Sequence, residues 1–187
     1  MTQSGHACRL LLVCLAVLLP VQAYAKDDTY HEDTVLKEVS DFFGEGARDV
    51  AKVVQKVFKD QGEPVAYIKG KEASGALGIG ARYGDGTLYM KNGYHRKIHW
   101  TGPSIGFDAG GDVSKVFVLV YNLHSVESLF QRFPAVEGSL YVVGGISANY
   151  HRSEGIVLAP IRLGAGLRTG VNVGYMKYTK KKTWNPF

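Results

Sequence analysis

The sequence contains little cysteine, little proline and no long apolar run. Two cysteines and six prolines occur among its 187 residues, and Cys8 and Cys14 both lie within the first 25 positions. The rest of the chain therefore has no thiol for a disulfide framework or a thiolate zinc site. With so few prolines, the 23 glycines do not belong to a low-complexity Gly/Pro tract, and the 45% of apolar residues suffices for the core of one domain.

Residues 1–25 have the pattern of a secretory signal peptide. Arg9 precedes an apolar run at residues 10–19, Pro20 ends the run, and Ala23 and Ala25 place small residues before the mature chain. The run is too short to cross the ~30 Å hydrocarbon core of a membrane. We therefore predict cleavage after Ala25, a periplasmic location, and a protein that neither spans the membrane nor meets nucleic acid.

The charge of the remaining chain is unevenly distributed. Residues 26–60 contain 6 basic and 9 acidic side chains, a net charge of −3, whereas residues 61–187 contain 15 and 8, a net charge of +7. A basic body in an exported protein favours acidic partners such as lipid headgroups or anionic glycans. Alternatively, the acidic segment packs beside the basic body and neutralises part of it. The candidate partners are an envelope lipid, a glycan or a protein, and no oligomeric state is predicted.

Residues 26–62 form an acidic N-terminal segment with a helical pattern. Apolar residues recur at helical spacing from Val35 to Phe43, Gly44 and Gly46 interrupt the pattern, and a second apolar stripe covers residues 47–57. The pattern predicts two short helices, or one kinked helix, ending at residues 61–62. Because the polar face of the stripe carries charges of both signs, we expect it to pack against the body rather than on a membrane surface.

Residues 63–187 have strand periodicity. Asn92-Gly93 is a strong hairpin signal, and a short helical turn at residues 126–133 follows a potential cap at Ser125. The expected strands cover residues 64–69, 73–83, 87–91, 94–100, 113–123, 139–150, 155–166 and 168–179.

Repeated glycines inside these strands predict sharp curvature, as a small barrel requires. The expected fold class is mainly β, a small antiparallel β-barrel with N-terminal helices packed against it, and a two-sheet sandwich is the alternative. A membrane-spanning barrel is disfavoured because residues 116–121 are apolar on both faces instead of alternating.

The catalytic motifs in the sequence are weak. Residues 102–106 match the G-x-S-x-G pattern of a serine nucleophile elbow, but no helical pattern follows Ser104, so we interpret the motif as a turn between strands. His95 and His99 are about 13 Å apart if they lie on one strand, too far to share a metal ion. The sequence therefore predicts no enzyme, no cofactor and no metal site, and a serine hydrolase is a less favoured hypothesis.

Basic and aromatic residues within the strands are the candidate binding residues. An arginine inside a small barrel is costly unless it is paired or faces water. A basic and aromatic surface suits a sugar or a phosphate-bearing envelope molecule, whereas the alternative places the arginines outward and the aromatic rings in the core. The candidate binding residues are Arg82, Trp100, Arg132, Tyr150, Arg162 and Arg168.

Several long motifs resemble the EipA family of exported envelope-integrity proteins. They are FFG at 42–44, AKVVQKVF at 51–58, EASGA at 72–76, WTGPSIGFD at 100–108, LFQRFP at 129–134, VEG at 136–138, VLAPIR at 157–162 and TWNPF at 183–187. The resemblance implies a periplasmic small antiparallel β-barrel with N-terminal helices and no known catalytic activity. It also implies a role in keeping the envelope sound, connected with cell-wall or lipopolysaccharide layers and division, but it offers no ligand or catalytic residues to carry over.

These observations lead to one functional hypothesis and an alternative. The chain is expected to be a non-enzymatic periplasmic protein that supports cell-envelope integrity by contacting an anionic envelope component. The alternative is a periplasmic barrel that binds or carries lipid.

Overall fold

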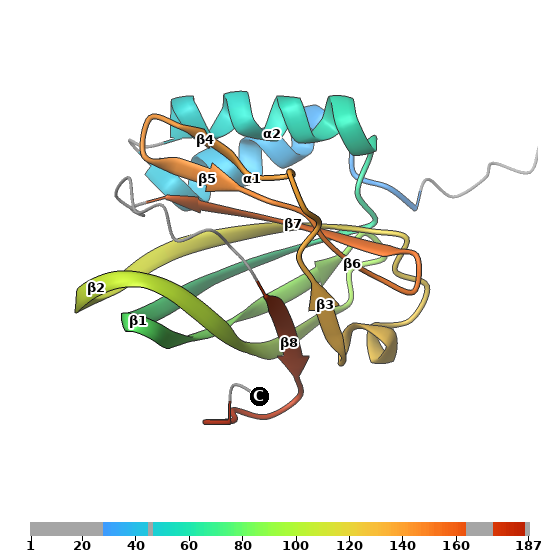
Figure 1. Ribbon diagram of the computed structural model, residues 1–187. Helices are drawn as coiled ribbons and strands as arrows, with labels where there is room; N and C mark the ends of the chain where they lie inside the picture. Colours follow the sequence, from blue (N-terminus) through green and yellow to red (C-terminus); the bar gives the residue numbers. More distant parts are fainter. Residues whose placement is uncertain (1–27, 45–46, 164–173, 186–187) are drawn as a thin grey trace, which may run out of the picture.

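The computed structural model describes residues 28–44, 47–163 and 174–185 (Figure 1). The predicted signal peptide and the candidate binding residue Arg168 lie outside the described residues. Within the described part, neither helix combines the length and the apolar character that crossing a bilayer would need.

Two helices cover one face of a β-sheet. Helices α1 (Glu32–Phe43) and α2 (Ala47–Gln61) lie beside each other over the sheet in Figure 1. Their apolar stripes, including Val39, Val53 and Val57, are buried against strand residues such as Phe117 and Ile161. The predicted helices and their packing against the body are therefore confirmed.

Contacts made by two lysine side chains of the sheet also join it to the helices. Glu38 of α1 forms an ion pair with Lys69, and the Lys115 ammonium donates a hydrogen bond to the Phe42 carbonyl oxygen at 2.9 Å. The acidic segment thus lies against the basic body and neutralises part of its charge.

The body is a strongly curled, barrel-like antiparallel sheet of eight strands. The order along the sheet is β3-β8-β2-β7-β5-β4, β1 pairs with β2, and β6 pairs with β7. The strands are β1 (Ala66–Met90), β2 (His95–Tyr121), β3 (Arg132–Pro134), β4 (Tyr141–Val143), β5 (Ile146–Ala148), β6 (His151–Ser153), β7 (Ile156–Leu163) and β8 (Tyr175–Thr179). This architecture confirms the predicted mainly-β, barrel-like fold with N-terminal helices.

The curl arises because the long β1–β2 ribbon bends back over itself. Strand β2 pairs with β8 around Trp100 and with β7 around Phe117, so its two halves belong to opposite walls. An isolated bridge between Ala135 and His151 connects those walls on the other side.

The predicted turn at residues 102–106 is wrong, because these residues lie inside β2. Gly102 pairs with Arg82 and Gly106 pairs with Gly78 of β1, so the three strand runs predicted between residues 64 and 91 merge into one strand. Glycine is needed for the close approach of β8, since a Cβ at Gly102 would lie 2.2 Å from the Tyr175 carbonyl oxygen. No strand-to-helix turn surrounds Ser104, so the geometry of a nucleophile elbow is missing.

The hairpin at Asn92-Gly93 is confirmed, but its loop is longer than expected. The Met90 amide donates to the Tyr94 carbonyl oxygen at 2.8 Å, and the Gly93 amide donates to the Met90 carbonyl oxygen at 3.0 Å. Only Gly93 of the three loop residues has a positive φ, 88°. The loop is therefore a turn followed by a left-handed glycine rather than a two-residue turn with two left-handed residues.

Two other predicted elements differ from the structure: one strand is divided into a hairpin, and one helical turn is shorter than expected. The strand expected at residues 139–150 is the β4–β5 hairpin, which turns at Gly144 and Gly145 with φ values of 55° and 79°. Ser125 caps the 3-10 helix η2 (Val126–Leu129), and the helical turn expected to reach residue 133 ends there because β3 follows.

The inward face of the curl is filled by large side chains. Inward and outward positions alternate along each strand. The fully buried residues of this inner core include Ile68, Leu88, Ile98, Trp100, Phe133, Leu158 and Tyr178. In the described part of the chain, the inner core is packed with side chains.

The Trp100 ring can lie in the inner core only because its neighbours on β1 are glycines. A Cβ at Gly84 would lie 2.0 Å from Trp100 Cε2, well inside van der Waals contact. We expect Gly84→Ala to lower the free energy of unfolding by about 1–3 kcal/mol through overpacking. Chemical denaturation measures the loss, and the exposed neighbour Asp85→Ala is the control. Equal stabilities for the two variants would show that the Trp100 ring does not require the space left at Gly84.

Candidate functional site

Three of the predicted binding residues meet at one buried carboxylate, that of Glu72 on β1. Arg162 Nε donates to Glu72 Oε1 at 2.9 Å and Trp100 Nε1 donates to Oε2 at 2.8 Å. Arg82 Nε lies 3.3 Å from the same Oε1 as an ion pair. Glu72 is only 3% exposed, so these partners replace the water that a carboxylate would otherwise require.

This cluster continues across the barrel through polar side chains. Arg162 Nη1 donates to Asn149 Oδ1 at 3.1 Å, and Asn149 Nδ2 lies 2.7 Å from His151 Nε2. His151 Nδ1 lies 3.0 Å from the Phe133 carbonyl oxygen. If Asn149 donates to Nε2, His151 is neutral and donates from Nδ1, which satisfies both ring nitrogens.

Burial and charge set the protonation of these groups. Burial alone would raise the pKa of Glu72, but the charges of Arg162 and Arg82 outweigh it and lower that pKa. Burial, aided by the Arg162 charge, lowers the pKa of His151 to about 4, so this histidine is neutral at neutral pH. We name Glu72, Arg82, Trp100, Asn149, His151 and Arg162 the Glu72 cluster.

The chemistry of the Glu72 cluster is that of a structural cross-link between strands. Two guanidinium groups share one carboxylate, and Arg162 and Trp100 use N–H donors on its oxygens. Tyr178 Oη is buried nearby and has no hydrogen-bond partner among the described residues. No group of three metal-ligating side chains occurs in the described part of the chain.

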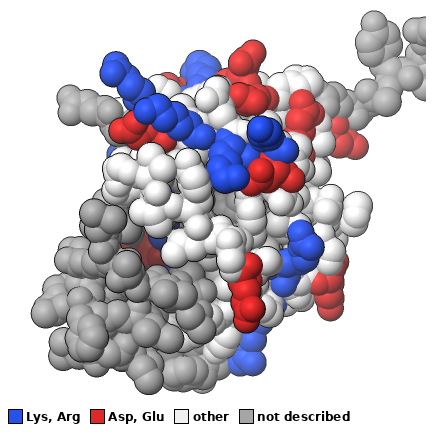
Figure 2. Space-filling model, turned by 45° about the horizontal axis from the view of Figure 1, so that its top comes forward, with Lys and Arg blue, Asp and Glu red and all other residues white. Residues whose placement is uncertain are grey.

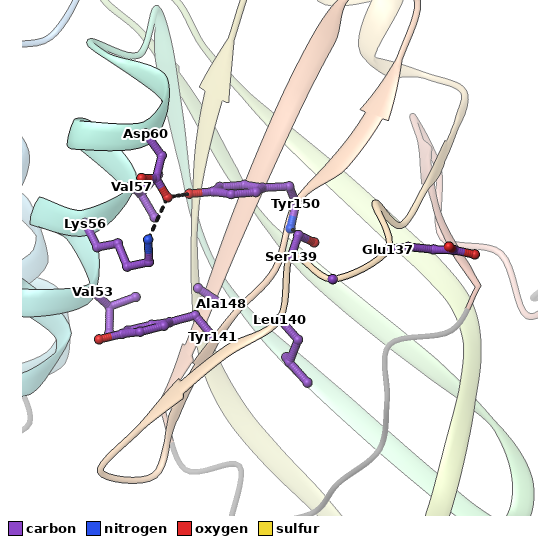
Figure 3. A pocket seen from close by; sticks show the side chains of 11 residues that line it. Val53, Lys56, Val57, Asp60, Glu137, Ser139, Leu140, Tyr141, Ala148 and Tyr150 are labelled. Atoms are coloured by element: carbon purple, nitrogen blue, oxygen red, sulfur yellow. Dashed lines mark hydrogen bonds and ion pairs between the residues drawn. The ribbon is translucent and has the colours of Figure 1, made fainter.

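Tyr150 lies elsewhere, in the wall of a pocket beside α2 (Figure 3). The pocket has a volume of about 370 Å³ and lies between α2 and the segment that leads into β4. Tyr150 Oη donates to Asp60 Oδ2 at 2.9 Å, and Lys56 Nζ donates to the same oxygen at 2.9 Å. Tyr150 is thus separated from the Glu72 cluster and belongs to a second candidate site.

Arg132 lies on a third surface, the outward face of β3 and β8. Its guanidinium carbon is 5.0 Å from the centre of the Tyr175 ring, and Arg132 pairs in register with Lys177. Lys182 Nζ is 4.4 Å from the centre of the Trp184 ring, which is 69% exposed. We call Arg132, Tyr175, Lys177, Lys182 and Trp184 the basic–aromatic face.

The segment after β8 is anchored onto β1. Tyr83 Oη donates to the Trp184 carbonyl oxygen at 2.8 Å, and the two ring centres are 5.6 Å apart. Residues 175–187 contain four lysines and no acidic residue. Of these lysines, Lys180 forms an ion pair with Glu127, which also binds Arg96. Among the described residues, one acidic group is therefore shared by two cations on this side.

The helix face differs from the basic–aromatic face in its charge pattern. Figure 2 shows basic and acidic side chains interspersed where the helices come forward. Many of them are paired, as in Lys37–Asp41, Lys52–Asp49 and Lys56–Asp60. Charge on the helix face is therefore largely balanced by local ion pairs.

The predicted binding residues thus divide among three places. Arg82, Trp100 and Arg162 come together in the interior, Tyr150 lines the pocket, and Arg132 contributes to the basic–aromatic face. The sequence analysis missed Glu72, Asn149 and His151. Glu72 fell in the gap between the strands predicted at residues 64–69 and 73–83, whereas the structure places it inside β1.

The chain is similar over most of its length to one protein family and to a solved structure. Residues 28–187 match the family described as Envelope integrity protein A, EipA. A crystal structure described as a beta-barrel-like, uncharacterized protein from Brucella abortus has a TM-score of 0.77 and 46% sequence identity, over 86% of this chain and 99% of that chain. No curated protein matches the chain.

Proposed function

Because the chain belongs to the envelope integrity protein A family, we propose that it supports the cell envelope from the periplasm by docking on anionic phospholipid headgroups. The basic–aromatic face is the docking surface, and the protein performs no catalysis. Membership of this family implies a role in envelope integrity. The periplasmic location, the lipid surface and the absence of catalysis are proposed in addition to it.

The observation that carries the proposal is the combination of an exposed tryptophan with Lys177 and Lys182, neither of which forms an ion pair with an acidic side chain in the described part of the chain. Trp184 is 69% exposed beneath Lys182, and tryptophan is favoured at the level of lipid headgroups. Each Lys or Arg near an anionic membrane contributes about 1 kcal/mol. Arg132 and Lys177 extend the positive charge along the sheet, so several weak contacts add up.

The Glu72 cluster supports a role without catalysis. Its arginines are engaged by Glu72 and Asn149 within the interior, rather than presented to a substrate. Ser104 lies on a strand and not at a nucleophile elbow. The inner core is also filled by residues such as Ile98 and Tyr178, which favours surface docking over an acyl chain carried inside the barrel.

Vesicle sedimentation tests the proposal. We expect residues 26–187 to bind vesicles of phosphatidylglycerol and phosphatidylethanolamine, but not pure phosphatidylcholine, and to dissociate at high salt. Lys177→Glu combined with Lys182→Glu should weaken binding by at least about tenfold, since two favourable contacts become repulsive. In a strain that lacks the gene, this variant should also fail to restore detergent tolerance.

The matched control is Lys37→Glu combined with Lys52→Glu, which makes the same change of net charge on exposed helix positions. This control should bind almost as well as the unmodified protein. Equal losses in both double variants would assign binding to net charge and contradict docking by the basic–aromatic face. Binding to a soluble anionic polysaccharide, with no binding to either kind of vesicle, would identify a glycan and overturn the phospholipid proposal.

A further inference from the structure

Exposed apolar side chains gather beside the pocket at α2. Six large apolar residues are well exposed in the described part of the chain, and three of them, Val136, Leu140 and Val142, fall within residues 136–142. Scattered apolar residues are ordinary on a protein surface. A concentration of them next to a cavity is typical of an interaction site.

The pocket itself has an apolar floor. Val53 and Val57 of α2 and Ala148 of β5 line it, and all three are buried and belong to the core between helices and sheet. Tyr141 and Tyr150 form half-buried walls (Figure 3). A volume of about 370 Å³ is at the lower end for ligand pockets and accommodates a large apolar or aromatic group.

Three polar side chains at the pocket, those of Lys56, Asp60 and Tyr150, are already engaged with one another. Asp60 accepts hydrogen bonds from Lys56 and Tyr150, which lower the pKa of its carboxyl group. The Lys56 ammonium also lies 5.6 Å from the centre of the Tyr141 ring. An occupant therefore gains most from the apolar floor and the tyrosine rings and does not need a charge of its own.

A strand edge lies next to this pocket. Strand β4 ends the sheet order and pairs with β5 through Tyr141–Ala148, Val142–Ser147 and Val143–Ile146. Since the hairpin loop has two residues, the Val143–Ile146 pair is the hydrogen-bonded one, and the Val142 N–H and C=O point away from β5. Among the described strands, none pairs with this outer edge of β4.

The alternation of side chains matches an added strand. Tyr141 lines the pocket on one face of β4, whereas Val142 points to the other face and is 44% exposed. An extended polypeptide beside β4 would place one side chain against Tyr141 and the pocket and the next against Val142. An acyl chain could enter the pocket but would leave the main-chain groups of Val142 unused.

We propose that the pocket and the outer edge of β4 bind an extended polypeptide segment of a partner protein. The segment adds a strand to β4 and inserts one large apolar or aromatic side chain between Tyr141 and Tyr150. This site is independent of the phospholipid docking surface, and either proposal can fail without the other.

Short synthetic peptides test this site directly. The probes are Thr-Val-Thr-X-Thr-Val-Thr peptides, blocked at both ends, with X as Trp, Phe, Leu or Ser. Calorimetric titration into residues 26–187 should show that the best apolar peptide binds at least about tenfold more tightly than the Ser peptide. Methyl resonances of Val53, Val57 and Ala148 should shift on binding.

Two variants locate the contact. Val142→Pro removes the outward N–H of β4 and should weaken binding of the best peptide by about tenfold or more. Val113→Lys alters another exposed valine, which is 68% exposed on β2, and should bind as the unmodified protein does. Circular dichroism of Val142→Pro checks that the fold persists, and Val142→Lys replaces it if the hairpin is lost.

Three results would overturn the proposal. No difference between the apolar peptides and the Ser peptide would show that the pocket does not accept a side chain. Acetyl-tryptophanamide binding as tightly as the Trp peptide, with no effect of either Val142 variant, would assign the pocket to a small molecule. Concentration-dependent dimers that either Val142 variant abolishes would identify a second copy of this chain as the occupant.

Discussion

Replacing Glu72 by Gln is expected to lower the free energy of unfolding by about 3–5 kcal/mol. Two guanidinium groups of the interior share this one carboxylate: Arg162 is buried, and the Arg82 side chain is 12% exposed. Removing its charge leaves both cations without an opposite charge among the described side chains of the interior. Equilibrium unfolding in urea near pH 7 measures the change, with the exposed Glu137→Gln as the matched control.

Because two arginines share one carboxylate, we expect the loss of one arginine to cost less stability than the loss of the carboxylate charge. Arg82→Met leaves Glu72 with Arg162 as a balanced pair, so it should cost clearly less, about 1–2 kcal/mol. An Arg82→Met loss as large as that of Glu72→Gln would show that Arg82 does more than balance charge. A Glu72→Gln loss below about 1 kcal/mol would show that water or another group compensates the arginines.

The stability test also bears on function. The Glu72 cluster connects β1, β2 and β7 and reaches Phe133 of β3 through His151, so it fixes how the two walls of the curl lie against each other. Those walls carry the pocket and the basic–aromatic face. Loss of envelope integrity in a Glu72 variant would therefore arise from unfolding, whereas the Lys177 and Lys182 variants leave the core intact.

The fold was predictable where a local pattern reports a local structure. The helical spacing at Val35 and Val39 gave the correct α1, and Asn92-Gly93 gave the correct hairpin position. The motif at residues 102–106 was misjudged because glycines signal both a turn and a close approach between strands. Gly102 permits a close approach between strands, and only the position of Tyr175 on β8, far away in sequence, shows this.

The candidate site was predictable in its residue types but not in its arrangement. The rule that an inward arginine must be paired applies to Arg82 and Arg162, yet their shared partner is 90 positions from Arg162 in the sequence. Composition could not distinguish the buried Arg162 from the exposed Arg132, because both occur in strands. Their difference depends on which face of a strand is inward, which the curl of the sheet decides.

The two proposed surfaces lie on opposite sides of the molecule. Figure 1 shows α2 and the β4–β5 hairpin on one side of the sheet, and β8 with the chain's C-terminal end on the other. A protein docked on phospholipid through Lys177 and Trp184 would present the pocket away from the membrane. This arrangement would let it bring a partner polypeptide to the membrane surface without competition between the two sites.

His151 gives the fold a dependence on pH that begins above the range in which ordinary carboxylates titrate. Its ring is 1% exposed, and its pKa of about 4 compares with 6.5 for a free histidine. Burial and the nearby charges of Arg162 and Arg82 oppose its protonation, while Glu72 and the Phe133 carbonyl favour it less strongly. The folded state therefore holds the neutral form, and the unfolded chain binds the proton more readily.

Stability from His151 should be complete above pH 6.5 and should decline as the pH falls toward 4, by about 3 kcal/mol in all. His151→Gln cannot titrate, so it should be less stable than the unmodified protein at pH 7 but lose less stability on acidification, and the two curves should converge. Urea unfolding between about pH 7 and pH 4.5 measures this difference. Titration of Glu72 does not contribute in the upper part of this range, because the lowered pKa of Glu72 places its titration at lower pH. The exposed His124→Gln is the matched control. Parallel curves for His151→Gln and the unmodified protein would mean that the folded state accommodates the imidazolium, which the buried arginines on either side of Glu72 oppose.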